Sequence, residues 1–68
     1  MSSVQIDETA DVSPEAFVGR GTIVWNWTKV REGARIGEDV VIGQHCYIDH
    51  DVVIGDRCKI QNGVNVFH

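Results

Sequence analysis

Residues 34–60 read ARIGED VVIGQH CYIDHD VVIGDR CKI when they are divided into groups of six. The third position of every group is isoleucine, from Ile36 to Ile60, and the first position is a smaller residue. Isoleucine and other β-branched residues suit strands because their stiff side chains pack well on a pleated surface. This stretch therefore predicts a repeating unit that consists of one short strand and one turn.

The pattern extends in both directions from this stretch. An isoleucine or valine occupies every sixth position of a column of large residues: Ile6, Val12, Val18, Val24, Val30, Ile36, Ile42, Ile48, Ile54, Ile60 and Val66. A second column lies two positions earlier in each repeat: Val4, Ala10, Ala16, Thr22, Thr28, Ala34, Val40, Cys46, Val52, Cys58 and Val64. A fixed period of this kind predicts a solenoid, in which each repeat stacks on the next and has no core of its own.

Three six-residue units would close a triangular coil, with each strand hydrogen-bonded in parallel to the strand one coil below. The predicted fold is all-β, a parallel β-helix with three hexapeptide rungs per coil and about three and a half coils. Residues 1–5 form a lead-in and residues 6–68 form the repeats. Because the repeat still runs at Val66, we expect a longer solenoid that is incomplete at this end, or a chain that associates.

The residue after each large residue is expected to leave the strand. Glycine occupies this position at Gly19, Gly37, Gly43 and Gly55, and Asp7 and Asp49 replace it elsewhere. Both residue types tolerate unusual backbone dihedral angles, so we expect such angles at these positions. Cys46 and Cys58 belong to the smaller column and are predicted to be reduced core thiols.

The composition excludes several classes of function. The net charge is −4 and the six Lys and Arg residues are scattered, so a nucleic-acid partner is not expected. No apolar run approaches the length of a membrane span, so no membrane partner is expected either. A secretory signal typically has a basic start followed by an apolar stretch, and the N-terminus has neither. The prediction is a cytoplasmic protein.

The 18-residue coil converts spacing in the sequence into stacking in space. Glu8, Asn26, Gln44 and Asn62 fall in one vertical column at a turn. Two interpretations stay open for them: an amide ladder along one corner of the prism, or a row of donors and acceptors for a polar ligand.

The three histidines raise the question of a metal site. His50 and His68 are one coil apart and should be neighbours, while His45 lies one corner earlier. Imidazoles are good zinc ligands, and a catalytic zinc site keeps three protein ligands with an open position. The γ-class carbonic anhydrases share this repeat and have two ligand histidines five residues apart, as His45 and His50 are. The remaining ligand of that family would map to Thr9, which cannot replace a histidine, so no metal is expected.

Apolar residues outside the two columns suggest an interface. Trp25 and Trp27 flank Asn26 on a turn. Ile23 and Val41 should be adjacent on the outer side of the first face. Phe17 and Val53 are likewise expected side by side on the third face. Such exposed apolar rows suggest contact with other copies or a ligand wall, although the tryptophans could also merely cover a corner.

Several segments resemble the bacterial hexapeptide acyltransferases, whose fold is a left-handed parallel β-helix. More narrowly, residues 23–27 (IVWNW), 32–37 (EGARIG), 41–46 (VIGQHC) and 53–66 (VIGDRCKIQNGVNV) are similar to one branch. This branch contains the N-acetyltransferases that act on UDP-linked 3-amino sugars, typified by UDP-2-acetamido-3-amino-2,3-dideoxyglucuronate N-acetyltransferase. The resemblance covers essentially all of residues 7–68. It departs from the family in length, because members continue for several more coils that form much of the groove for coenzyme A.

The resemblance implies an acetyl-CoA-dependent N-acetyltransferase of a UDP-linked amino sugar, working as a homotrimer with its ligands in grooves between subunits. The implied substrate-binding residues are Trp25, Asn26, Gln44 and Asn62, with His68 also lining the groove. His68 is the candidate catalytic base, since an amine that attacks a thioester must lose a proton. Two alternatives stay open: a non-enzymatic β-helical trimerisation module, and a zinc enzyme of the γ-carbonic anhydrase type.

Overall fold

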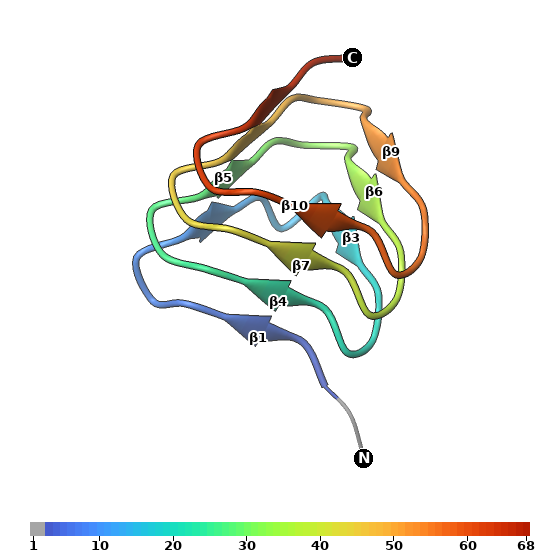
Figure 1. The fold of residues 1–68 in the computed structure, drawn as a ribbon. Coiled ribbons are helices and arrows are strands. Elements are labelled where there is room, and N and C mark those ends of the chain that lie inside the picture. The colour runs from blue at the N-terminus through green and yellow to red at the C-terminus, as the bar shows by residue number, and fades with distance from the viewer. Residues whose placement is uncertain (1–2) are drawn as a thin grey trace.

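The computed structural model describes residues 3–68 as a left-handed parallel β-helix with a triangular cross-section (Figure 1). Eleven two-residue strands follow one another along the chain, and no helix occurs between residues 3 and 68. The first sheet contains β1 (Gln5–Ile6), β4 (Ile23–Val24), β7 (Val41–Ile42) and β10 (Lys59–Ile60). The second contains β2 (Asp11–Val12), β5 (Lys29–Val30), β8 (Tyr47–Ile48) and β11 (Asn65–Val66). The third contains β3 (Phe17–Val18), β6 (Arg35–Ile36) and β9 (Val53–Ile54).

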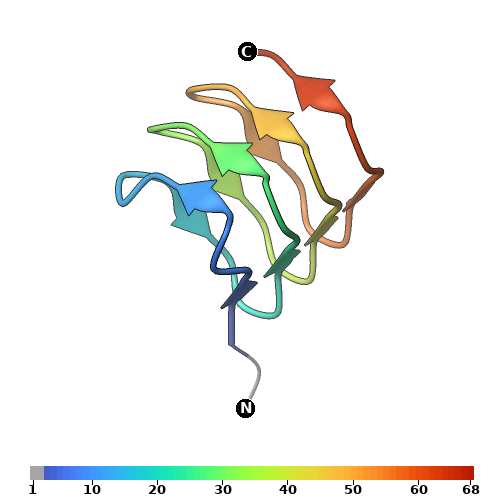
Figure 2. The same ribbon diagram turned by 90° about the vertical axis from the view of Figure 1, so that its left-hand side faces the viewer.

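The strand register confirms the predicted coil. Each strand from β1 to β8 pairs in parallel with the strand 18 residues later, as when Val24 pairs with Ile42 and Ile42 with Ile60. Figure 2 shows the coils stacked in chain order from the N-terminus to the C-terminus. The molecule measures 30 × 21 × 20 Å. Within the described part of the chain, no helix is long and apolar enough to cross a membrane.

The core is the interior of the two middle coils. Both predicted columns point inward there, and the buried apolar residues are Val24, Val30, Ala34, Ile36, Val40, Ile42, Cys46, Ile48, Val52 and Ile54. Burial falls off along the axis, and Ile6 in the first coil is 44% exposed because no described coil lies below it. A solenoid buries a residue only between two neighbouring coils, so stability is concentrated in the centre.

The two buried threonines occupy the smaller column without leaving a polar group unpaired. Thr28 Oγ1 donates to the Gly43 carbonyl oxygen at 2.6 Å and accepts from the Cys46 N–H at 3.2 Å. Thr22 makes the equivalent pair of bonds with Gly37 and Val40. Each hydroxyl therefore links two coils at a corner, where a buried polar group without a partner would be costly.

The prediction of unusual dihedral angles at Gly19, Gly37, Gly43, Gly55, Asp7 and Asp49 is wrong. Positive φ angles lie two residues further along, at Gly21, Trp27, Gly33, Asp39, His45, Asp51, Arg57 and Gly63. The turn needs its left-handed residue at this later position. From Gly33 onward, the N–H of each of these residues bonds to a carbonyl one coil below, as His45 N does to Asn26 O at 3.0 Å. Glycine at position 43 has a different cause, because a Cβ there would lie 2.8 Å from the Asn62 nitrogen.

Two further predictions need correction. Cys46 is buried, and its thiol donates to the Gln61 carbonyl oxygen at 3.0 Å, but Cys58 is exposed because no described coil lies above it. Both cysteines are free thiols. Phe17 and Val53 are not adjacent on the third face, since each pairs with Arg35, which lies between them. Ile23 and Val41 do pair directly, as predicted.

Candidate functional site

The polar side chains that the sequence singled out lie at two corners, at opposite ends of the second sheet. The first corner consists of residues 7–9, 25–27, 43–45 and 61–63, which precede that sheet. The second corner consists of residues 13–15, 31–33, 49–51 and 67–68, which follow it. The two corners belong to different edges of the prism, so each is a separate candidate site.

The first corner carries a hollow of about 320 Å³ lined by Trp25, Asn26, Gln44 and Asn62. All four residues that the resemblance implied for substrate binding are thus brought together by the coil. Asn26, Gln44 and Asn62 stack at 18-residue intervals, and Trp25 lies beside them on the lowest of these three turns. We call this surface the amide hollow. It offers an indole face and several amide groups, which suits a ligand with both an aromatic ring and polar atoms.

Asn62 is held in place by the turn below it. Its Oδ1 accepts a hydrogen bond from the Gln44 N–H at 3.0 Å, directly above the position where Gly43 lacks a Cβ. Asp56 makes the equivalent bond to the Glu38 N–H at 2.9 Å, so this contact is a feature of the repeat. Because the oxygen is already used, Asn62 presents its NH₂ group as the free donor.

Trp25 and Trp27 play different parts. Trp25 is 50% exposed and lines both the amide hollow and a second hollow of about 420 Å³, formed with Val4–Asp7, Ile23 and Val24. Trp27 is 61% exposed and lines neither of these hollows. It has a φ of 61°, which is unfavourable for a bulky residue, and its N–H donates to Thr9 Oγ1 at 3.0 Å.

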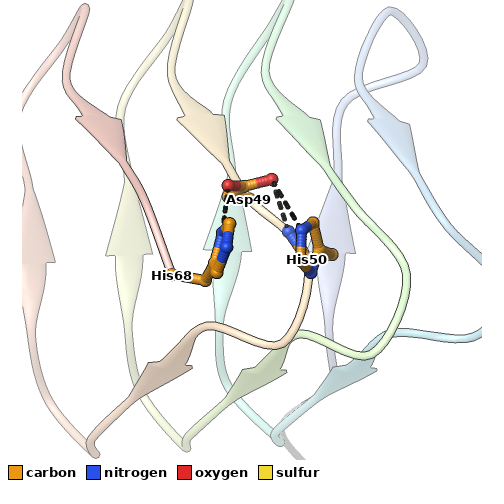
Figure 3. Close-up of side chains that lie close together, drawn as sticks. All are labelled: Asp49, His50 and His68. Atoms are coloured by element: carbon orange, nitrogen blue, oxygen red, sulfur yellow. Dashed lines mark hydrogen bonds and ion pairs between the residues drawn. The ribbon is translucent and has the colours of Figure 1, made fainter.

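The second corner contains a histidine bound to a buried carboxylate (Figure 3). His68 Nδ1 lies 2.7 Å from Asp49 Oδ2, and Asp49 is only 6% exposed. Nδ1 must carry the proton of this bond when Asp49 is ionised, because a carboxylate only accepts. Nε2 of a neutral His68 is then left with a lone pair. This tautomer is the one that a general base requires.

The other oxygen of Asp49 is held by two donors. The His50 N–H donates to Asp49 Oδ1 at 2.8 Å, and the Tyr47 hydroxyl donates to it at 3.2 Å. The Tyr47 hydroxyl in turn accepts from Arg31 Nη1 at 2.9 Å. The carboxylate orientation is therefore fixed from within the second sheet and its corner.

Charge at the second corner follows from these contacts. The His68 hydrogen bond is the main reason that the pKa of Asp49 lies well below its usual range, and the bonds from His50 and Tyr47 add to the effect. The pKa of Glu32 is also lowered, chiefly by its hydrogen bond from Arg31. Both carboxylates are thus anions at neutral pH.

The structure does not bring His68 into the amide hollow, although both were expected to line one groove. Within one copy, His68 and Asn62 lie at different corners. His45 and His50, the pair compared with zinc ligands, are separated in the same way. His50 and His68 are neighbours as predicted, with ring centroids 4.0 Å apart.

Asp49 and Tyr47 were missed as site residues. The 18-residue period places residue 67 directly above Asp49. His68 is therefore one residue past the position that stacks on Asp49 in the next coil. A signal was present, because Asp49 stands where four other repeats have glycine. It was interpreted as a turn residue instead of a polar group facing the next coil.

The comparison with protein families agrees with this geometry. The family described as bacterial transferase hexapeptide (six repeats) matches residues 15–49 and again residues 33–68. The chain belongs to this family. The two matches overlap, and together they include the amide hollow and the Asp49–His68 pair. No curated protein matches this chain.

Membership supports an acyltransferase type of role for the chain. Family membership does not identify a substrate, because the members share the repeat and not a particular binding site. Any choice of substrate therefore depends on the side chains that this chain places at its corners.

Proposed function

We propose that the protein is an acetyl-CoA-dependent N-acetyltransferase that acts on a UDP-linked amino sugar. The observation that carries the proposal is the Asp49–His68 pair, which presents a general base on a hexapeptide transferase coil. The amide hollow supports the choice of a nucleotide sugar, because an indole face can stack on a pyrimidine ring and amides can bond to sugar hydroxyls.

The reaction needs one proton to be moved. The amine nitrogen attacks the thioester carbonyl carbon, a C–N bond forms, and the C–S bond breaks to release the thiolate of coenzyme A. His68 Nε2 accepts the proton of the attacking amine and then gives it to the leaving sulfur. The Asp49 carboxylate keeps the ring oriented and stabilises the imidazolium that exists between the two steps.

A site that uses both corners requires more than one copy of the chain. Three prisms packed around a threefold axis meet through unlike faces, so each groove is lined by different corners of two neighbours. The amide hollow of one copy and the Asp49–His68 pair of the next would then form one site. Exposed apolar side chains at Phe17, Trp25, Trp27, Val53 and Phe67 provide surface for such contacts.

We therefore expect sedimentation velocity at micromolar concentration to give a species of three chains. The exposed apolar side chains favour association because burying them removes apolar area from water. A single well-folded species with the mass of one chain would contradict the trimer. It would also leave the two corners without a common groove.

Nucleotide binding tests the assignment of the amide hollow. We expect UDP to quench the fluorescence of the Trp27→Phe variant, in which Trp25 is the remaining indole, because Trp25 lines the hollow. The Trp25→Phe variant retains only Trp27 and should show little quenching. The measurement is a fluorescence titration of both variants with UDP and with inorganic phosphate as the control ligand.

Asn62→Asp is the matched test of the amide column. It keeps the oxygen that accepts from Gln44 N–H, as Asp56 does in the preceding repeat, but it removes the NH₂ donor and adds a negative charge. We expect UDP affinity to fall about tenfold or more, since a lost hydrogen bond and repulsion of the diphosphate act together. Equal quenching in all variants would rule out the hollow as the nucleotide site and favour a non-enzymatic assembly module.

A further inference from the structure

The second corner holds three side chains of the types that bind transition metals. Asp49, His50 and His68 each offer a ligand atom, and these atoms all lie within 4.8 Å of one another (Figure 3). Asp49 is buried, His50 is about one third exposed and His68 is more open to solvent. We propose that this cluster is a zinc site, with Asp49, His50 and His68 as its protein ligands.

The distances require only small movements. Ligands that lie about 2.0–2.1 Å from a tetrahedral zinc ion are separated from one another by about 3.3 Å. The three ligand atoms lie within 4.8 Å of one another, so His50 has to approach the other two ligands by at most about 1.5 Å on binding. His68 Nδ1 and Asp49 Oδ2 are hydrogen-bonded at 2.7 Å and must separate by about 0.6 Å.

The two rings also need to turn. They are stacked with centroids 4.0 Å apart and planes inclined at 35°. Imidazole lone pairs lie in the ring plane, so the rings must rotate until those lone pairs converge on the ion. Both side chains are partly exposed to solvent, at 35% for His50 and 57% for His68, so neither ring is enclosed by the core.

The surroundings already orient the ligands. His50 Nδ1 lies 3.2 Å from Asp51 Oδ2, which directs its N–H to that carboxylate and leaves Nε2 for a metal. Asp49 Oδ1 is occupied by the N–H of His50 and the hydroxyl of Tyr47, so Oδ2 is the oxygen available to the ion. Such outer contacts fix the orientation of ligands in zinc proteins.

The local charge favours a dication. Asp49, Glu32 and Asp51 contribute three carboxylates, and Arg31 is the cation that pairs with this group, through Glu32 at 2.9 Å and Asp49 at 3.8 Å. Two imidazoles with one carboxylate suit zinc and its neighbours in the first transition row. Calcium and magnesium prefer oxygen ligands alone.

The expectation of no metal depended on the histidines alone. It compared His45 and His50 with a known ligand pair and found no third histidine at Thr9. The proposed site uses neither His45 nor Thr9, because Asp49 supplies the third ligand from the same corner as His50 and His68.

His68 cannot bind zinc and act as a general base at the same time. When Nδ1 of His68 binds the ion, its proton moves through solvent to Nε2, and Nε2 no longer has a lone pair. This consequence alone rests on the proposed acyl transfer, since binding of zinc does not require any turnover. Zinc should then inhibit the transferase, with loss of inhibition in variants that no longer bind it.

The direct test is isothermal titration of the untagged chain with zinc chloride. We expect one zinc ion per chain for the wild type, and affinity at least about 100-fold lower for His50→Asn, which removes a ligand. His45→Asn is the matched control, because His45 lies at the first corner and asparagine tolerates its φ of 57°. Asp51→Asn should weaken binding about tenfold through the loss of an outer contact.

A second readout separates binding from folding. Thermal unfolding of each variant without zinc shows whether its fold is retained, and zinc should raise the melting temperature of the wild type and of His45→Asn but not of His50→Asn. No zinc binding by the wild type at micromolar concentration would overturn the proposal. Equal affinity in His50→Asn, or a loss confined to His45→Asn, would do the same. None of these outcomes depends on whether the protein transfers acetyl groups.

Discussion

Ile42→Asp is expected to leave the protein unfolded at room temperature. Ile42 is 0% exposed and sits in the middle of the first sheet, paired with Val24 below and Ile60 above. An aspartate there would place a carboxylate in the dry interior with no partner, which costs several kcal/mol. Domains are stable by only about 5–15 kcal/mol in total, and a short solenoid is expected near the lower limit. Circular dichroism and thermal melting measure the effect.

Lys59→Asp is the control for this prediction. It introduces the same residue on the neighbouring strand β10, at an exposed position that points away from the core. We expect its free energy of unfolding to change by less than about 1 kcal/mol, the range of strand preference at a surface position. If Ile42→Asp melted within a degree or two of the wild type, the assignment of the inward column would be wrong.

The coil could be predicted because burial leaves a periodic trace in the sequence. A residue such as Ile36 is restricted by contacts above, below and across the prism, so every sixth position must be apolar and of the right size. The stacking of Gln44 on Asn26 then follows from arithmetic alone. For the same reason the amide hollow could be predicted from the sequence, because Asn26, Gln44 and Asn62 share one period and Trp25 is adjacent to Asn26.

The second corner could not be derived in the same way. Asp49 faces His68 across 19 residues, one more than the coil, so the contact depends on how the side chains bend across the turn. The positions with positive φ were also predicted wrongly. Gly43 is required by the close approach of Asn62 and does not itself have a positive φ angle. Periodicity reports which residues share a column, but side-chain direction at a corner is set by individual hydrogen bonds.

His68→Gln is expected to lower kcat for acetyl transfer by about 10²–10⁴-fold, with little change in KM. Glutamine has no basic nitrogen, so the attacking amine loses the group that accepts its proton. Asp49→Asn should lower kcat by about tenfold or more, because an amide in place of the carboxylate can donate to Nδ1 and leave the proton on Nε2. The measurement is the initial rate of coenzyme A release with a UDP-linked amino sugar at saturating acetyl-CoA.

Mixed trimers decide whether His68 acts in a site shared between copies. A copy with His68→Gln keeps an intact amide hollow, and a copy with Asn62→Asp keeps an intact Asp49–His68 pair. If each groove combines the first corner of one copy with the second corner of the next, random 1:1 mixing should restore about a quarter of the grooves. At a sugar concentration well below KM, each variant alone should have no more than about a tenth of the wild-type activity, and a mixture in which every copy carries both changes should have less. If the 1:1 mixture gained nothing over its two components, a groove shared in this way would be excluded. His68 would then have no route to a sugar held in the amide hollow, since the two lie at different corners of a single copy.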